Sequence, residues 1–355
     1  MDPRLAALAQ AHGVATWYED WRHRRVEIAP ETVVAVLGLL GVDAGDPAAV
    51  SAALAAARAA DGAALPDTVV LRAGATRVLP GPGTVMLEYG GTRAVDGELP
   101  GDLPLGWHRL ACDAREVPLV VVPSRLPAPP RAWGWTLQLY ALRSERSWGM
   151  GDLGDLAAFT RWAGETGAGF VLLNPLHATG PAHPVTASPY SPSSRRFVNP
   201  LYLRVADTPA YRAADPATRA VVDALRPDAG DLIDHDVVWA AKRHALELLQ
   251  PYAEPVDLTA DPDLAAFATW CALAERHGND WRSWPAELRR PDGPAVAAER
   301  ARAADRVAFH AWLQHLCDRQ LDAAAAAART AGMPVGVVHD LAVGIDPGGA
   351  DGWQL

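Results

Sequence analysis

The sequence predicts an α/β protein. An N-terminal helical segment comes first, a small β-sandwich follows, and the last domain begins as a strand–helix–strand unit. Three observations support this order: helical spacing of apolar residues near the start, a shortening to strand-length pieces separated by Pro-Gly turns, and a buried strand, helix and strand after a proline-rich stretch. The length of 355 residues is sufficient for two or three domains at roughly 150 residues each.

Residues 1–65 are expected to form the helical segment. Between Pro30 and Gly41, apolar side chains occupy positions 33, 34, 36, 37 and 40, which lie on one side of a helix. Proline near the start and glycine at the end are typical helix boundaries. The helical pattern extends to about Gly62.

Residues 66–123 are expected to form the small β-sandwich, built on an antiparallel sheet. The β-rich pieces are 68–71, 84–89, 107–111 and 119–122. Turn sequences separate them, including Pro80-Gly81-Pro82-Gly83. Residues 124–130 then form a stiff, proline-rich linker and the clearest domain boundary.

The last domain, residues 131–355, alternates strands and helices. We expect strands at 135–142, 170–173 and 335–338, helices at 153–165 and 294–331, the latter in one or two pieces, and a helical insertion at about 201–293. Three parallel strands leave open sheet edges and do not close a barrel, which needs eight. Either the strand count is short or the chain is incomplete.

Composition excludes several classes of function. The chain is 50% hydrophobic and 21% charged, as in ordinary globular proteins, and its net charge of −10 disfavours nucleic acid as a partner. The cysteines, Cys112, Cys271 and Cys317, are widely separated, so they indicate neither a disulfide framework nor a zinc site. No signal peptide or membrane span is predicted. We therefore expect a cytoplasmic protein without a membrane partner.

A glycine-rich motif, Gly149-Met150-Gly151-Asp152-Leu153-Gly154, lies between a strand and a helix, where dinucleotides bind in other folds. Six residues separate the strand from the first glycine, however, and the next strand ends in Asn174 rather than in an acid. An ordinary glycine-rich loop with an aspartate cap is the favoured interpretation, and dinucleotide binding is the alternative.

Three other segments carry candidate site residues. Ser188-Pro189-Tyr190 follows the second strand, and its hydroxyl groups and aromatic ring suit a sugar, although a proline-stiffened surface loop has the same composition. His339-Asp340 ends the third strand, at the edge where barrel enzymes place their sites, although a capping or solvated loop pair is an equally good interpretation of these two residues. Asp234-His235-Asp236 could ligate a metal, but a loop or helix start is the favoured interpretation, and no metal site is predicted.

Several short sequence motifs, in the same order along the chain, resemble those of the bacterial 4-α-glucanotransferases, the amylomaltases of glycoside hydrolase family 77. They include Gln138-Leu139-Tyr140, Ser147-Trp148-Gly149-Met150-Gly151-Asp152, Leu173-Asn174-Pro175-Leu176-His177, Ser188-Pro189-Tyr190 and Asp340-Leu341-Ala342. The helical start and the small β-domain also resemble those of N-terminally extended members. The resemblance therefore covers nearly the whole chain.

The resemblance implies an α/β fold with an incomplete (β/α)8 barrel. It further implies transfer of 4-α-glucan segments between maltooligosaccharides with retention, by a carboxylate nucleophile and a separate acid. The family's sequence motifs around the nucleophile, the general acid and the stabilising carboxylate are not found. The resemblance therefore implies that these residues lie beyond Leu355, and no catalytic residue is assigned. Tyr190, Asp340 and Ser188 match donor-sugar positions.

The resemblance implies no cofactor and leaves the oligomeric state open. The partners expected are maltooligosaccharides or other α-1,4-glucans. We expect the 355-residue chain alone to be inactive, because the groups that act as a unit in catalysis are missing from it. A non-catalytic maltodextrin-binding or scaffold fragment is the alternative function.

Overall fold

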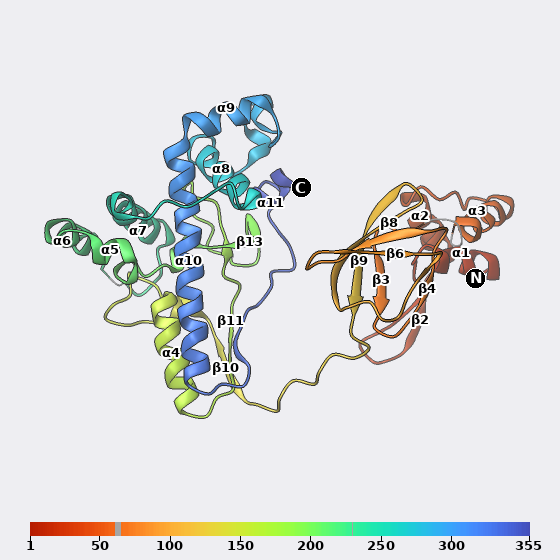
Figure 1. Cartoon of the computed structure of the whole chain (residues 1–355), viewed down its shortest axis with the longest axis horizontal. Helices are drawn as coiled ribbons and strands as arrows, with labels where there is room; N and C mark the ends of the chain where they lie inside the picture. Colours follow the sequence, from red (N-terminus) through yellow and green to blue (C-terminus); the bar gives the residue numbers. More distant parts are fainter. Residues whose placement is uncertain (61–64, 229) are drawn as a thin grey trace. The chain divides into compact units, whose positions relative to one another are not determined.

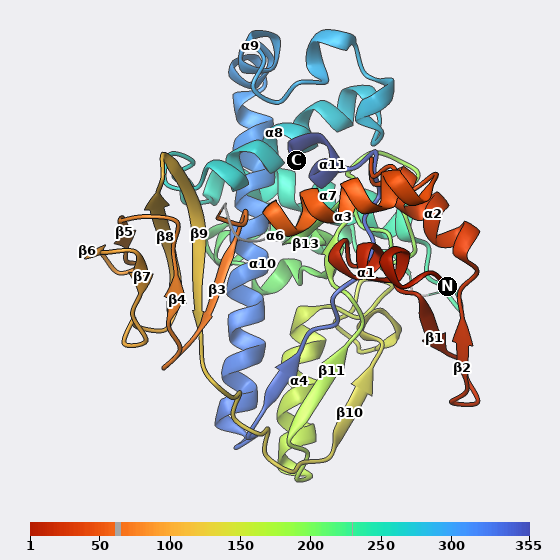
Figure 2. The same ribbon diagram turned by 90° about the vertical axis from the view of Figure 1, so that its right-hand side faces the viewer.

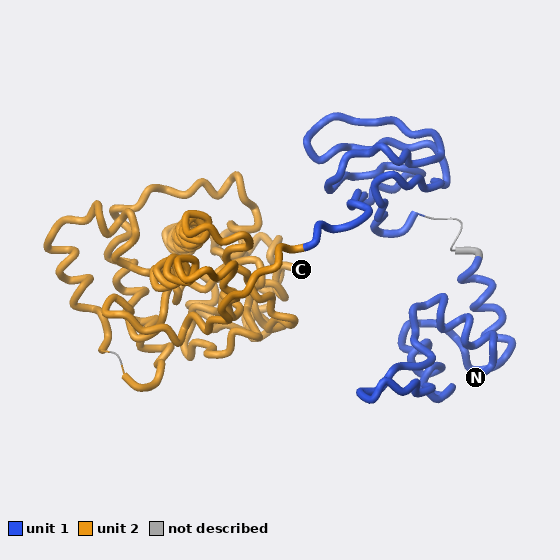
Figure 3. The backbone as a smooth tube through the Cα atoms, turned by 90° about the horizontal axis from the view of Figure 1, so that it is seen from below, with its two compact units in different colours: residues 1–128 blue, residues 129–355 orange. Residues whose placement is uncertain are grey.

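The computed structural model describes residues 1–60, 65–228 and 230–355 (Figure 1). Contacts divide the chain into two compact units, Met1–Ala128 and Pro129–Leu355 (Figure 3). The predicted end of the helical segment near Gly62 lies outside the described residues.

Unit 1 begins with three helices around a small apolar core. They are α1 (Pro3–Ala11), α2 (Pro30–Leu39) and α3 (Pro47–Ala60). Each starts with proline, whose fixed φ and missing N–H suit the first helical turn. The side chains of Leu8 and Leu37 are fully buried between them.

A β-hairpin between α1 and α2 was missed by the sequence prediction of a helical segment. Strand β1 (Trp17–Glu19) pairs antiparallel with β2 (Arg25–Glu27). The helical spacing of the flanking residues does not extend into this stretch, where charged and aromatic side chains predominate. The short strands are almost wholly exposed, so the hairpin contributes little to the core.

The rest of unit 1 is a five-stranded sheet in the order β3-β9-β8-β5-β6 and a separate antiparallel pair, β4 with β7. The strands are β3 (Val69–Arg72), β4 (Arg77–Val78), β5 (Gly83–Met86), β6 (Thr92–Val95), β7 (Glu98–Leu99), β8 (Gly106–Cys112) and β9 (Arg115–Val122). Leu99 of β7 and Leu110 of β8 are fully buried in one core that both sheets share.

One pairing contradicts the predicted antiparallel sheet, because β3 and β9 run parallel. Tight turns enforce antiparallel pairing only between strands that follow each other directly. The long stretch of chain between β3 and β9 allows β9 to return alongside β3 in the same direction. A sequence pattern of short strands and turns does not reveal this pairing.

Unit 2 is built on a parallel sheet in the order β10-β11-β14. The strands are β10 (Gly134–Leu137), β11 (Phe170–Leu173) and β14 (Gly336–Val338). Helices α4 (Leu153–Glu165) and α10 (Ala304–Thr330) pack against each other and cover one face of this sheet (Figure 2). Val171 and Leu173 alternate into the core beneath them.

The first strand of this sheet is shorter than the predicted strand at 135–142. It ends at Leu137, and a 3₁₀ turn, η1 (Leu139–Ala141), follows. The backbone N–H of Leu139 donates to Oδ1 of Asn174 at 2.8 Å. The Asn174 side chain therefore takes the place of a backbone carbonyl as the acceptor for Leu139, and the strand ends before this residue.

The segment between β11 and α10 forms most of the remaining helices. They are α5 (Pro209–Ala213), α6 (Pro216–Ala224), α7 (His235–Leu249), α8 (Pro262–His277) and α9 (Pro294–Arg302), with 3₁₀ turns η2 (Pro200–Tyr202), η3 (Val205–Asp207), η4 (Gln250–Tyr252), η5 (Trp281–Ser283) and η6 (Ala286–Leu288). An antiparallel pair, β12 (His177–Ala178) and β13 (Ser194–Val198), precedes them, and α11 (Ala350–Gln354) follows β14. The helical prediction for 294–331, which left open one or two pieces, is confirmed, and the structure has two pieces, α9 and α10.

A polar cluster connects α7, α8 and α10. Nε of Arg306 donates to Glu275 at 2.8 Å, and Nη1 donates to Glu247 at 2.9 Å. Nε2 of His310 lies 3.2 Å from Oε1 of Glu275. Burial alone would raise the pKa of Glu275, but the interactions with His310 and Arg306 outweigh burial and lower the pKa to about 2.

This pKa predicts an acid-dependent loss of stability. The pKa of Glu275 in the folded state lies below that of an unfolded glutamate. The contribution of Glu275 to the free energy of unfolding is therefore complete above about pH 4.5 and is lost as the pH falls toward 2. Glu275→Gln should remove about 3 kcal/mol of that pH-dependent stability, an upper bound from the shift. Urea unfolding at several pH values measures it. The exposed control Glu254→Gln should keep the wild-type pH dependence, and an unchanged dependence in E275Q would contradict the assignment.

Candidate functional site

The carboxyl ends of β10, β11 and β14 share one edge of the sheet, because the three strands are parallel. The residues that leave this edge are Gln138 after β10, Asn174 after β11, and His339 and Asp340 after β14. Ligand sites in parallel α/β sheets form outside this edge. We call this edge and the loops that follow it the rim.

Asn174 connects the first two loops of the rim. Its side chain is buried, and its amide nitrogen donates to the carbonyl of Pro175 at 2.8 Å and to the hydroxyl of Tyr202 at 3.1 Å. With the bond to Leu139, these contacts satisfy both ends of the amide. The loops after β10 and β11 are therefore held together by one side chain.

His177 connects the second loop to the third. Its Nε2 accepts the backbone N–H of Ala342 at 3.3 Å. Burial lowers the pKa of His177, the cation of Arg195 lowers it further, and the anion of Asp340 opposes them. The imidazole is therefore neutral at neutral pH and keeps the lone pair that the Ala342 N–H needs. Asp340 itself follows β14, the strand that pairs with β11, at the same edge of the sheet.

Arg195 of β13 forms hydrogen bonds with the segment after β14. Its Nη1 donates to the carbonyls of Ala342 at 3.4 Å and Val343 at 3.2 Å. Its backbone N–H donates to the buried carboxylate of Asp351 at 2.8 Å. The loop that carries Asp340 is thus held by side chains from β12 and β13.

Ser188 and Tyr190 lie together in the loop before β13. The backbone N–H of Tyr190 is 3.4 Å from Oγ of Ser188, and the Tyr190 side chain is 53% exposed. Ser188 lines a small hollow at the rim, together with His177, Tyr202 and His235. Tyr190 and Asp340 do not line this hollow, and no hydrogen bond between the described residues joins them.

Asp234-His235-Asp236 forms a helix start, as favoured by the sequence analysis. Asp234 caps α7 by accepting the backbone N–H of Val237 at 3.0 Å. Asp236 accepts the N–H of Val185 at 2.8 Å and pairs with His183 at 2.7 Å. Within residues 1–60, 65–228 and 230–355, no group of three or more His, Cys, Asp or Glu side chains could hold a metal ion.

The glycine-rich motif packs against protein rather than presenting a ligand site. The side chain of Asp152 accepts the backbone N–H of Gly154 at 2.9 Å and of Asp155 at 3.0 Å, which caps α4. A Cβ on Gly154 would come within 2.5 Å of Nε of Arg204, and one on Gly151 within 2.0 Å of the carbonyl of Leu139. The helix N-terminus is therefore already occupied by a carboxylate, and this geometry disfavours the dinucleotide alternative.

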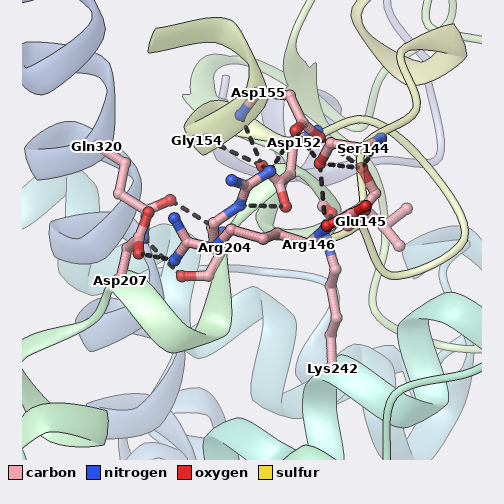
Figure 4. A network of polar contacts seen from close by, with 12 residues as sticks. Ser144, Glu145, Arg146, Asp152, Gly154, Asp155, Arg204, Asp207, Lys242 and Gln320 are labelled. Atoms are coloured by element: carbon pink, nitrogen blue, oxygen red, sulfur yellow. Dashed lines mark hydrogen bonds and ion pairs between the residues drawn. The ribbon is translucent and has the colours of Figure 1, made fainter. Parts of the chain in front are cut away.

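A buried ion network lies under this motif. Arg204 pairs with Asp152, at 2.7 Å from Nη2 to Oδ1, and also with Asp155 (Figure 4). Hydroxyl groups of Ser144 and Ser147 donate to Asp155 at 2.6 and 2.8 Å. All three charged side chains are at most 5% exposed. The network fixes the loop between β10 and α4, and hence one side of the rim.

Lys242 of α7 adds a second cation beside this network. It is the only lysine in the sequence, and its side chain is completely buried. Its Nζ donates to the carbonyl of Leu201 at 2.6 Å, and burial lowers its pKa to about 8 although the charge of Asp152 opposes this. Two buried carboxylates thus face two buried cations.

Sequence reasoning placed three of these residues at the site and missed the rest. Asp340 lies on the rim directly after β14, and Ser188 and Tyr190 lie in one loop. The supporting residues Asn174, His177, Arg195, Arg204 and Lys242 were not assigned a role. For Lys242 a signal existed, because its helix neighbours at positions 238, 239, 245 and 246 are apolar.

The sequence profile of glycoside hydrolase family 77, described as 4-alpha-glucanotransferase, matches residues 137–355. This range contains β11, β14, the last residue of β10 and the complete set of candidate residues. The chain belongs to the 4-alpha-glucanotransferase family.

Individual relatives agree with the family match. A 4-alpha-glucanotransferase of Mycobacterium tuberculosis is 42% identical, over 99% of this chain and 57% of the relative. The one from Haemophilus influenzae is 32% identical, over 71% of this chain and 42% of the relative. The chain therefore spans somewhat more than half the length of the mycobacterial relative.

Solved structures agree as well. The amylomaltase of Corynebacterium glutamicum is similar with a TM-score of 0.74 and 32% identity, over 99% of this chain and 56% of that one. The amylomaltase of Streptococcus agalactiae in complex with acarbose, at 18% identity, has a TM-score of 0.53 over 64% of this chain and supports the fold alone. The chain therefore has the mixed α/β architecture of an amylomaltase over the length that it covers.

The buried network predicts a large difference between two arginine substitutions. Arg204→Met leaves two buried carboxylates without their cation and should lower the free energy of unfolding by about 3–5 kcal/mol. Arg146→Met breaks the exposed pair with Asp207, whose side chains are 58% and 39% exposed, and should cost less than about 1 kcal/mol. Chemical denaturation measures both. Equal effects of the two substitutions would show that the network does not stabilise unit 2.

Proposed function

We propose that this chain is part of a 4-α-glucanotransferase that transfers 4-α-glucan segments between maltooligosaccharides with retention. The observation that carries the proposal is the coincidence of the family match with the parallel sheet and with Asp340, Ser188 and Tyr190 around its carboxyl edge. The relatives' activity is assigned to proteins longer than this chain. The proposal therefore concerns the protein to which these residues belong.

In this proposal β10, β11 and β14 are the first three strands of a (β/α)8 barrel, and residues 201–293 form a helical insertion. The helical segment (residues 1–65) and the β-sandwich (residues 66–123) precede the barrel, and the linker 124–130 connects the sandwich to it. Two features support the incomplete barrel. Both outer strands of the sheet, β10 and β14, lack a second partner among the described residues, and Trp135 of β10 contacts Trp162 of α4 while remaining 40% exposed.

The rim residues suit a neutral sugar. A carboxylate at Asp340 accepts hydrogen bonds from sugar hydroxyls, the ring of Tyr190 stacks on the apolar face of a pyranose, and the Ser188 hydroxyl donates or accepts. A neutral His177 holds the Asp340 loop without placing a second positive charge at the rim. This chemistry is consistent with binding a maltooligosaccharide at the donor position.

Glycosyl transfer with retention needs a carboxylate nucleophile and a separate acid. We assign neither to these 355 residues, and the protein needs no cofactor or metal in this mechanism, since the carboxylates transfer the proton. A cytoplasmic location fits the three buried cysteines, Cys112, Cys271 and Cys317, which form no disulfides. In the part of the chain that the structure describes, no helix combines the length and apolar character that crossing a membrane requires.

The competing function is a non-catalytic maltodextrin-binding or scaffold protein. It would use the same Tyr190 and Asp340 and needs no catalytic carboxylates. It predicts measurable affinity for maltotriose without turnover in every form of the protein, including one extended to the length of the relatives.

A maltotriose assay distinguishes these functions. A protein extended to the full length of its relatives should convert maltotriose into glucose and longer maltooligosaccharides, whereas the 355-residue chain should give no products. Chromatography of the reaction mixture measures both. Products from the shorter chain would place the catalytic groups within it, and no products from the extended protein would reject the transferase.

Substitutions at the rim test the assigned residues in the extended protein. Asp340→Asn and Tyr190→Ala should each lower kcat/KM for maltotriose at least about tenfold, because each removes a contact with the donor sugar. Matched controls are Asp292→Asn and Tyr89→Ala, whose side chains are exposed elsewhere in the chain. If the rim variants retain the kcat/KM of their controls, the donor position lies elsewhere.

A further inference from the structure

The hairpin of unit 1 exposes three aromatic side chains within five residues. Trp17 is 44% exposed, Tyr18 53% and Trp21 81%. None of them belongs to the apolar core that the described residues of α1, α2 and α3 form. Exposed tryptophans in such a short stretch therefore do not serve the stability of this part of the chain, and clustered exposed aromatics mark binding surfaces.

The turn that carries Trp21 is well ordered by hydrogen bonds. Oδ1 of Asp20 accepts the backbone N–H of Arg22 at 2.8 Å and of Arg24 at 2.9 Å. The Asp20 carboxylate also pairs with the Arg24 guanidinium at 2.8 Å, and the backbone N–H of Asp20 donates to the Arg24 carbonyl at 2.9 Å. The loop therefore holds Trp21 outward in a fixed backbone, so little conformational entropy is lost when a ligand contacts it.

Guanidinium groups lie over both indole rings. The Arg22 guanidinium carbon is 4.4 Å from the centre of the Trp21 ring, and that of Arg25 is 4.6 Å from the centre of the Trp17 ring. Each ring keeps much of its surface exposed despite this contact. The result is a surface of flat apolar rings bordered by planar hydrogen-bond donors.

The charges of this hairpin cancel. Between Trp17 and Glu27 the sequence has three carboxylates and three arginines, and Arg25 pairs with Glu27 at 2.6 Å. A nucleic acid or another polyanion would find no excess of positive charge here. A neutral chain with apolar ring faces and many hydroxyl groups matches both the aromatic rings and the balanced charges.

We propose that the aromatic hairpin, residues 17–27 (β1 and β2 in Figure 2), binds an α-1,4-glucan chain through residues other than those of the rim. The choice of an α-glucan among neutral polysaccharides rests on the proposed function. Binding here would hold the protein on a long glucan and raise the local concentration of chain ends at the rim.

Native electrophoresis in gels that contain glycogen tests this site in the 355-residue chain. Glycogen should slow the wild-type chain, and Trp17→Ala/Trp21→Ala should weaken the apparent affinity at least about tenfold. Trp17→Phe/Trp21→Phe, which keeps the rings, should retain most of the affinity. Two controls should migrate like wild type: Trp107→Ala, which removes a 70% exposed tryptophan of β8, and Tyr89→Ala, which removes a 90% exposed tyrosine between β5 and β6.

Three results would overturn the proposal: no retardation of the wild-type chain, equal retardation of the double alanine variant, or equal retardation by a β-linked glucan such as hydroxyethyl cellulose. A far-ultraviolet circular dichroism spectrum like that of wild type shows that each variant is folded. If the double variant does not fold, Trp21→Ala alone, at the most exposed position, provides the test. Disproportionation of maltotriose by the extended protein is measured in parallel. If the wild-type chain is not retarded by glycogen while the extended protein turns over maltotriose, this site is rejected and the proposed function stands.

Discussion

Arg204 is the residue on which the geometry of unit 2 depends. It compensates the charges of Asp152 and Asp155, which are both buried at the first turn of α4. Burying an ion without a partner costs several kcal/mol, so this turn can be buried only while the guanidinium is in place. Gly154 leaves the space for it, and Gln320 of α10 accepts the backbone N–H of Arg204 at 2.9 Å. Through these contacts the sheet, α4 and α10 share one fixed arrangement.

At the rim, too, side chains from one segment satisfy polar groups of another. Asn174, His177 and Arg195 each satisfy backbone groups of a neighbouring loop, so the three loops after β10, β11 and β14 support one another. Each of these side chains makes at least one hydrogen bond within the protein. Ser188 and Tyr190, by contrast, keep exposed side chains. The structure thus separates residues that build the rim from residues that are free to meet a ligand.

The sequence predicted the helices and strands well where apolar periodicity is strong, as in α4, β11 and α10. It failed where side chains from distant segments decide the outcome. The end of β10 depends on Asn174, which is 35 residues from Leu139, and the parallel pairing of β3 with β9 depends on how the chain returns. The hairpin at Trp17 lacked an apolar face that would have predicted its strands. At the site, Asp340, Ser188 and Tyr190 were found by their position after the strands and by their resemblance to family motifs. Arg204 and His177 act through contacts that spacing along the sequence does not reveal.

Hydrogen–deuterium exchange of the extended protein, with and without acarbose, tests the central claim that this rim is the donor site. Acarbose is the compound bound in the Streptococcus agalactiae amylomaltase. The account predicts slower exchange in the peptides that contain residues 188–190 and 339–343 and little change in the peptides from α9. Protection confined to segments away from the carboxyl edge of β10, β11 and β14 would contradict it.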